Sequence, residues 1–275
     1  MDIDYLNLFE QRKLNSFAKA NENKYAQALP FSHIVIDEFL PTPIVEKVLY
    51  ELQHPKEINW NKYDNAAEKK LTYNNEDQMG ASTRMVLYQL NSSTFIRFLE
   101  ALTGIYGLIP DPHFKGGGIH QIERGGYFKI HADSNRHPKL LLDRRLVLLL
   151  YLNKDWKDEY GGHLELWNRD MTECVKRILP IFNRCVIFNT TDFSYHGHPE
   201  PLKCPEGETR KSLALYYYTN GRPSEEISTE HATLFQTRPG EKNLKLFLTS
   251  KLLLKKIIPP IFIELKNYWQ NFPNK

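Results

Sequence analysis

The sequence has 275 residues and a mass of 32.3 kDa, enough for one sizeable core with appendages or for two small domains. Its 41% hydrophobic and 25% charged residues are typical of a globular protein and exclude disordered, collagen-like and low-complexity chains. The formal net charge of +3 is too small to indicate a nucleic-acid partner, and none is expected.

Neither a transmembrane segment nor a secretory signal is expected. The longest dense apolar run, residues 146–152, is far shorter than the roughly 20 residues that cross a bilayer. The first residues mix acids and bases and lack the apolar stretch of a signal peptide. Cys174, Cys185 and Cys204 show no CxxC spacing, so neither disulfides nor a thiolate zinc site is indicated, and a cytoplasmic location is expected.

The first part of the chain predicts helices that pack on a sheet. Residues 1–28 are polar and compatible with a helix, whereas residues 33–39 (HIVIDEF) predict a strand. Thr42 is suited to cap a helix, and a further helix is predicted from Ser92 or Ser93 to Leu102. In the helix after Thr42 the apolar residues recur at helical spacing: Ile44, Val45, Val48, Leu49 and Leu52.

Two segments between these helices are not predicted to be helical. Residues 53–80 are polar and without periodicity, with Trp60, Tyr63 and Tyr73 among them, which is typical of a functional lid or a disordered loop. Residues 83–90 predict a strand.

Residues 116–218 predict an antiparallel barrel or sandwich. Short runs of β-branched and aromatic residues alternate there with turn clusters, and no helix of useful length fits. Residues 145–153 (RLVLLLYLN) are apolar at both alternating positions, which predicts a central strand covered on both faces.

The end of the chain is basic. Residues 241–275 contain seven lysines and two glutamates in a helical pattern. We favour a helix that covers one end of the barrel with its lysines solvated. Contact of residues 242–256 with an anionic membrane surface or a partner is the alternative.

Three side chains have the pattern of a metal site. His131 and Asp133 stand at i and i+2, so in an extended strand both project to the same face. His196 follows 65 residues after His131, behind the predicted strand 184–189. Two histidines and one carboxylate that leave the opposite face of a metal open form the triad that suits non-haem Fe(II).

A second pair points to a bound carboxylate. Arg210 and Ser212 share one face of the predicted strand 210–218, so a guanidinium and a hydroxyl converge there. A surface ion pair is the alternative for Arg210.

These residues together resemble the Fe(II)- and 2-oxoglutarate-dependent dioxygenases, in particular the prolyl 4-hydroxylase-like branch that includes the hypoxia-factor prolyl hydroxylases. The resemblance covers about residues 117–219 in four ordered motifs. They are GGYFKIHAD, YLNKDW followed by GGHL, PIFNRCVIF leading to Tyr195-His196, and Arg210-x-Ser212.

The resemblance implies a double-stranded β-helix and a hydroxylase that uses Fe(II), 2-oxoglutarate and O2, with ascorbate as an optional reductant, and releases succinate and CO2. His131, Asp133 and His196 are then the iron ligands. Arg210, Ser212 and Tyr151 hold the distal carboxylate of 2-oxoglutarate. On this basis residues 116–222 form the catalytic core, residues 1–115 supply supporting helices and strands of the same domain, and residues 223–275 form a helical extension.

The chain departs from the family pattern at two places. Ile122 stands where many relatives have a tyrosine at the cosubstrate site, and Tyr127 is expected to compensate for it. A turn-rich loop lengthens the segment between His196 and Arg210 and offers His198 as a rival iron ligand, although His196 has the better register.

The resemblance favours a prolyl or other residue of a peptide or protein as the substrate. Hydroxylation of a free amino acid or small metabolite is an alternative, and a non-catalytic cupin-like binding module is another. The loop around residues 60–73 could fold over an extended chain. Arg144, Arg145 and His137 either meet a charged substrate or are solvated loop charges. His163 is expected to pack or hydrogen-bond rather than bind iron.

Overall fold

The computed structural model describes residues 8–53 and 58–241, so the predictions for the basic tail lie outside the described residues. This part of the chain contains four α-helices and a sheet of 13 strands. The helices are α1 (Gln11–Ala26), α2 (Thr42–Gln53), α3 (Ala81–Leu90) and α4 (Ser93–Thr103), and none of them is long and apolar enough to cross a membrane. The strands are β1 (His33–Ile36), β2 (Asn61–Asp64), β3 (Glu68–Tyr73), β4 (Ile109–Pro110), β5 (Gly118–Glu123), β6 (Tyr127–Ala132), β7 (Asp143–Tyr151), β8 (Leu164–Trp167), β9 (Cys174–Ile178), β10 (Arg184–Asn189), β11 (His196–His198), β12 (Thr209–Thr219) and β13 (Leu234–Phe235).

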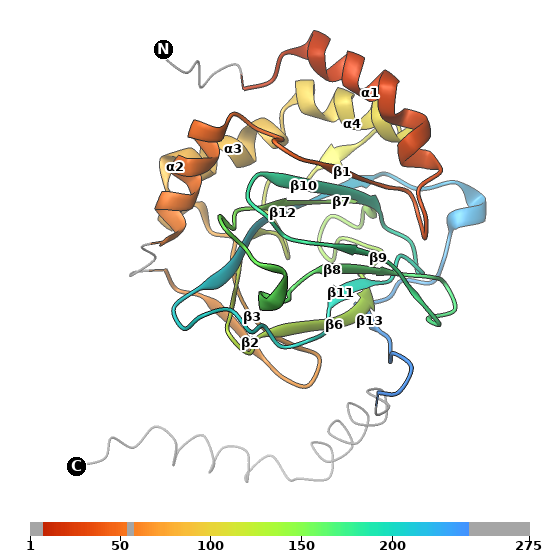
Figure 1. The fold of residues 1–275 in the computed structure, drawn as a ribbon. Coiled ribbons are helices and arrows are strands. Elements are labelled where there is room, and N and C mark those ends of the chain that lie inside the picture. Colours follow the sequence, from red (N-terminus) through yellow and green to blue (C-terminus); the bar gives the residue numbers. More distant parts are fainter. Residues whose placement is uncertain (1–7, 54–57, 242–275) are drawn as a thin grey trace, which may run out of the picture.

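The strands form two facing layers with the helices outside one of them. The major layer has the order β1-β10-β7-β12-β5, and the minor layer has the order β6-β11-β8-β9. The four helices lie over the outer face of the major layer, while the minor layer faces its other side (Figure 1). This is a double-stranded β-helix with flanking helices, as the sequence predicted; the three-part division of the chain stays a prediction.

Strand β7 lies at the centre of the major layer, between β10 and β12. Leu146, Leu148 and Leu150 belong to the core shared with the helices, whereas Val147 and Tyr151 belong to the smaller core between the layers. Both faces of β7 are therefore covered, which confirms the prediction made from its two-sided apolar pattern.

Helix α4 begins and packs as predicted. The Ser92 hydroxyl accepts a hydrogen bond from the Phe95 backbone N–H and caps the helix. Its buried apolar face packs against α1 and the sheet, through Phe95, Phe98, Leu99 and Leu102.

The prediction of a strand at residues 83–90 was wrong, because this segment is helix α3. Its buried residues Thr83, Val86, Leu87 and Leu90 have helical spacing. The Glu51 carboxylate, from α2, accepts hydrogen bonds from the backbone N–H groups of Ser82 and Thr83, both at 2.8 Å. A tertiary contact thus supplies the cap that the local sequence lacks.

Replacement of Glu51 by alanine should destabilise the protein by about 2 kcal/mol, because two N–H groups at the start of α3 lose their acceptor. The free energy of unfolding in urea measures the effect. Glu46→Ala is the matched control. Glu46 lies on the same helix α2, but its carboxylate makes an exposed ion pair with Lys154. Equal stability of the Glu51→Ala protein and wild type would contradict the capping role.

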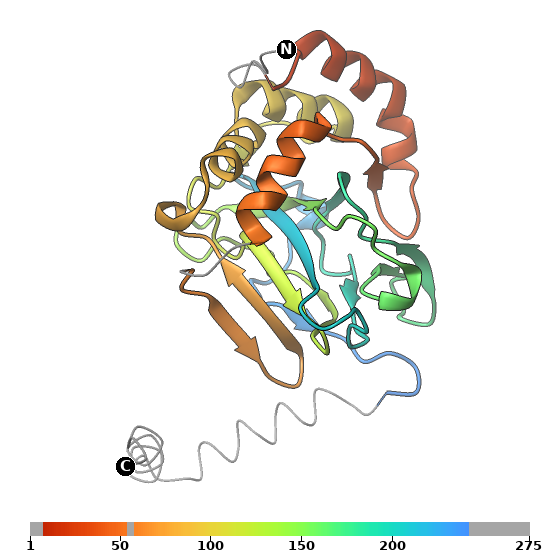
Figure 2. The ribbon, with the colours of Figure 1, turned by 60° about the vertical axis from the view of Figure 1, so that its left-hand side comes forward.

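Residues 61–73 are also ordered, which corrects the prediction of a long irregular segment. Strands β2 and β3 form a hairpin, and β3 pairs with both β5 and β6 (Figure 2). β3 thereby joins the major layer to the minor one. The pattern is polar because β2 is exposed along its length and only the end of β3 is buried.

Candidate metal centre

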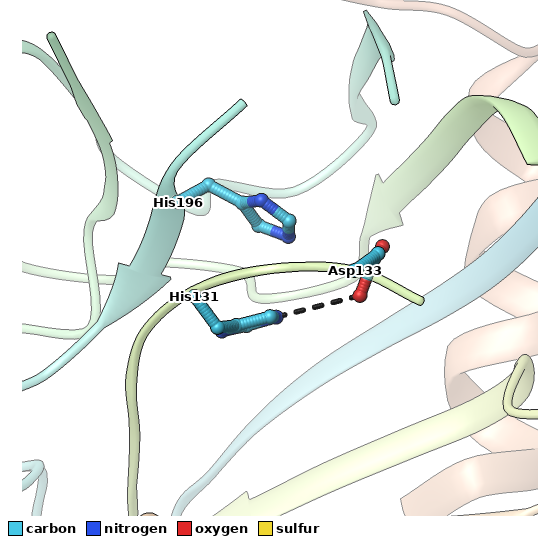
Figure 3. A group of neighbouring side chains, drawn as sticks. All are labelled: His131, Asp133 and His196. Atoms are coloured by element: carbon cyan, nitrogen blue, oxygen red, sulfur yellow. Dashed lines mark ion pairs between the residues drawn. The ribbon is translucent and has the colours of Figure 1, made fainter. Parts of the chain in front are cut away.

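His131, Asp133 and His196 lie together between the two layers (Figure 3). His131 is the last but one residue of β6, and Asp133 directly follows the strand. His196 begins β11, where it pairs with His131 across the strands. One potential ligand atom from each residue lies within 4.8 Å of the others, and all three side chains are buried. The structure therefore brings together the three residues predicted to bind metal.

Backbone contacts fix the tautomers of both histidines. The Nδ1 atom of His131 is 2.7 Å from the Lys129 carbonyl, and that of His196 is 2.9 Å from the Ser194 carbonyl. A carbonyl only accepts, so each Nδ1 carries the proton and each Nε2 keeps a lone pair. Within the described residues, the His131 Nε2 and Asp133 Oδ2 atoms are buried without a hydrogen-bond partner. Together with His196 Nε2, these atoms make a convergent set of two imidazole nitrogens and a carboxylate, which fits a divalent cation.

The electrostatics keep Asp133 ionised. Burial opposes its charge, but the neighbouring His131 and the Arg144 guanidinium outweigh burial and lower the pKa of the carboxyl far below its usual range. An Arg144 nitrogen lies 3.5 Å from Asp133 Oδ2. Burial, followed by the neighbouring His131, lowers the pKa of His196 to about 4. Both states, a carboxylate and a neutral imidazole, are those that bind metal.

A β-bulge in β6 determines which side chains face this cluster. His196 pairs with His131 and His198 pairs with Phe128, so two intervals on β11 match three on β6. The extra residue turns Phe128 inward and the preceding Tyr127 outward. The Tyr127 hydroxyl donates to the Asn65 carbonyl in the hairpin turn, at 2.8 Å. The structure therefore does not bring Tyr127 to the predicted cosubstrate site.

Arg210 lies deep between the layers and has the surroundings of a carboxylate-binding group. Its Nε donates to the Gly162 carbonyl at 2.8 Å and its Nη2 to the Tyr151 hydroxyl at 3.2 Å. Ser212 pairs directly opposite Tyr151, so its side chain lies on the same face of the sheet. Arg210 is 4% exposed and makes no ion pair with the described residues. The surface ion pair considered for it is thus excluded, and a bound carboxylate would complete its hydrogen bonds.

Gly162 leaves the room that Arg210 needs. Its φ of +72° favours glycine, and a Cβ there would lie 2.9 Å from the Arg210 Cδ atom. The second glycine of the GGHL motif thus has a steric reason in this site.

A cavity of about 410 Å³ opens beside Asp133. The β2–β3 hairpin lines the cavity through Glu68 and Lys70, and Arg144 and Phe235 also belong to its lining. The Lys70 ammonium lies 2.9 Å from Glu68 and 3.5 Å from the centre of the Phe128 ring. The predicted covering segment thus does line the cavity, as an ordered hairpin. Sequence reasoning missed Lys70, because residues 68–72 (EKKLT) show no alternation of polar and apolar side chains that would indicate a strand.

Other candidates from the sequence lie apart from this cavity or have structural partners. Arg145 pairs with Glu226 at 3.0 Å, and the buried His137 lies 3.5 Å from Asp111. His163 hydrogen-bonds Asp158 at 2.8 Å, as expected. Of the three entrance residues considered, only Arg144 lines the cavity.

Comparisons with known proteins agree with this geometry. The sequence model of the 2OG-Fe(II) oxygenase superfamily matches residues 117–218. Mouse prolyl 3-hydroxylase OGFOD1 is 31% identical over 86 residues, which are 30% of this chain and 15% of that protein, so the chain spans only a small part of this relative's length.

Solved structures show the same fold. A Pseudomonas putida prolyl-4-hydroxylase superposes with a TM-score of 0.52 at 15% identity, over 76% of this chain and 100% of the other. A Trichoplax adhaerens prolyl hydroxylase, solved with a hypoxia-inducible-factor peptide fragment, gives 0.54 at 18% identity, over 75% and 91%. Residues 117–218 thus match the 2OG-Fe(II) oxygenase superfamily, and the described residues have the fold of these solved hydroxylases.

Proposed function

We propose that this protein is an Fe(II)- and 2-oxoglutarate-dependent hydroxylase. The observation that carries the proposal is the presence, between the same two strand layers, of a convergent His-Asp-His cluster and a buried arginine without a carboxylate partner among the described residues. A non-catalytic binding module would have no need of a metal triad that leaves one face open.

Each group has a distinct task in this proposal. His131, Asp133 and His196 hold the iron, while Arg210, Tyr151 and Ser212 hold the distal carboxylate of 2-oxoglutarate. The bound metal, with 2-oxoglutarate and O2, supplies the oxidising chemistry that places a hydroxyl on a C–H bond and releases succinate and CO2. The protein's own contribution is position: strand β12 fixes Arg210 and Ser212, and the paired strands β6 and β11 fix the two histidines.

We propose a prolyl residue of a peptide or protein as the substrate. The cavity beside Asp133 is lined by the β2–β3 hairpin and by Ala232, Thr233 and Phe235, so two separate segments of the chain could contact an extended peptide. The relatives with this fold support the proposal, because one is named a prolyl 3-hydroxylase and another was solved with a peptide fragment bound.

A free amino acid is the second candidate, and the charges of the cavity favour it. Lys70 and Arg144 both line the opening, and either cation could pair with the α-carboxylate of a small substrate. An internal prolyl residue has no such carboxylate, so an acidic neighbour in the peptide would have to take its place.

The protein is proposed to act in the cytoplasm. In support of this location, Cys174, Cys185 and Cys204 are all free thiols, and the latter two are buried. Secretion with folding in an oxidising compartment would favour paired cysteines instead.

A mass-spectrometric assay tests the proposed function. The Fe(II)-loaded protein is incubated with 2-oxoglutarate and either a pool of proline-containing peptides or a panel of free amino acids, and succinate and the added mass of one oxygen are measured. We expect both signals with peptides. Signals with free amino acids alone would exclude the peptide substrate. A protein that binds neither Fe(II) nor 2-oxoglutarate would instead be a silent module.

A further inference from the structure

His198 is a buried histidine for which the fold itself shows no use. It lies on β11, two residues beyond His196, and is 4% exposed. Neither of its ring nitrogens has a hydrogen-bond partner within the part of the chain that the structure describes. A buried imidazole without partners costs free energy that an aliphatic side chain would not, so its presence calls for a ligand.

The strand pairing turns His198 toward the space between the layers. His196 and His198 project to the same face of β11, and the β6 bulge places His131 and Phe128 opposite them. Gly197, between the two histidines, has no room for a Cβ, because the Phe128 and Lys129 carbonyls would lie 2.8 and 2.9 Å from it. Strand β11 therefore packs closely on β6 at this point.

Three basic groups act electrostatically on His198: Arg210, Lys70 and His131. An imidazole carries at least one N–H in either charge state, and that N–H can donate a hydrogen bond to an anion.

The metal cluster does not account for this side chain. Among the described residues, the group whose ligand atoms lie within 4.8 Å of one another contains His131, Asp133 and His196 but not His198. The nearby Ile122 is apolar and packs with Trp156, Leu202 and Cys204, so it offers no donor to the pocket.

We propose that His198 binds 2-oxoglutarate, donating a hydrogen bond to the same distal carboxylate as Arg210 and Tyr151. The inference rests on the proposed function, because it takes 2-oxoglutarate as the cosubstrate. It extends that proposal by giving the carboxylate a third donor, which comes from the metal-binding strand β11 rather than from the strands of the major layer. Strand β11 would then contribute both to the metal site, through His196, and to the binding of the distal carboxylate, through His198.

The test is the affinity of 2-oxoglutarate for the Fe(II)-loaded protein under anaerobic conditions, followed by the visible charge-transfer band. His198→Val should raise the dissociation constant about tenfold, the loss of one hydrogen bond to a charged group. His198→Gln, which keeps a donor, should recover part of the affinity. His33→Val is the matched control, since His33 is also a buried strand histidine but contacts the Phe31 carbonyl.

A second ligand isolates the distal carboxylate. 2-Oxopentanoate keeps the carboxylate and keto group that chelate iron but lacks the far carboxylate. His198→Val should leave its affinity almost unchanged, which would support the assignment. An equal loss for both ligands, or unchanged affinity for 2-oxoglutarate, would overturn it, and so would loss of Fe(II) binding. If the wild-type protein itself binds no 2-oxoglutarate, the proposed function fails rather than the role of His198.

Discussion

Replacement of His131 by alanine should weaken Fe(II) binding by more than about 100-fold, because loss even of a residue that merely orients a metal ligand typically costs 10–100-fold. His131 Nε2 is buried, unsatisfied among the described residues, and held in place by the bond from Nδ1 to the Lys129 carbonyl. The alanine variant removes both the ligand and this orientation. Anaerobic titration with Fe(II) measures the effect, and the charge-transfer band with 2-oxoglutarate should disappear.

A matched histidine distinguishes this effect from a general loss of structure. His163→Ala removes another buried histidine, whose ring contacts Asp158 and Arg177 rather than the cluster. It should bind Fe(II) as wild type does. If the His131→Ala protein binds Fe(II) with wild-type affinity, the assignment of the metal site is wrong.

Replacement of Arg210 by alanine should weaken 2-oxoglutarate binding by at least about 30-fold, since truncation of one partner in a buried charge pair costs 2–5 kcal/mol. Arg210 is the buried guanidinium in contact with Tyr151 and Gly162, and its remaining donors have no acceptor side chain among the described residues. Fe(II) affinity should change little, because Arg210 is not in the metal cluster. The two affinities are measured on the same anaerobic samples.

Arg210→Lys tests whether charge alone suffices. A lysine keeps the positive charge but cannot form two parallel hydrogen bonds to a carboxylate, so we expect an intermediate affinity. Arg184→Ala serves as the control, since Arg184 is on the same sheet but pairs with Asp37. Wild-type affinity for 2-oxoglutarate in the folded Arg210→Ala protein would show that the carboxylate is held elsewhere.

The barrel and its buried groups could be predicted because their signals are local. Strand β7 is apolar at every position from Leu146 to Tyr151, and this pattern has one simple structural meaning. His131 and Asp133 are close in the sequence, so their common face follows from strand geometry alone. His196 and Arg210 are distant from His131 in the sequence, so they could be assigned to the same site only from the order of several motifs along the chain.

The parts that were wrong depend on contacts between distant segments. Helix α3 receives its cap from Glu51, and no local residue in its first turn indicates a helix start. The β6 bulge, which turns Tyr127 outward, is visible only once β11 is paired with it. Likewise the β2–β3 hairpin is held by its partners β5 and β6, because most of its own residues remain exposed or half-exposed.

The position of β3 also has an evolutionary consequence. This strand connects the two layers by backbone hydrogen bonds and carries Glu68 and Lys70 at the cavity mouth. Mutations that adapt the hairpin to a new substrate therefore also affect the pairing of β3 with β5 and β6, which joins the two layers. Substrate range and thermal stability should trade off along this hairpin, so exchange of the segment between relatives would require compensating changes in β5 and β6.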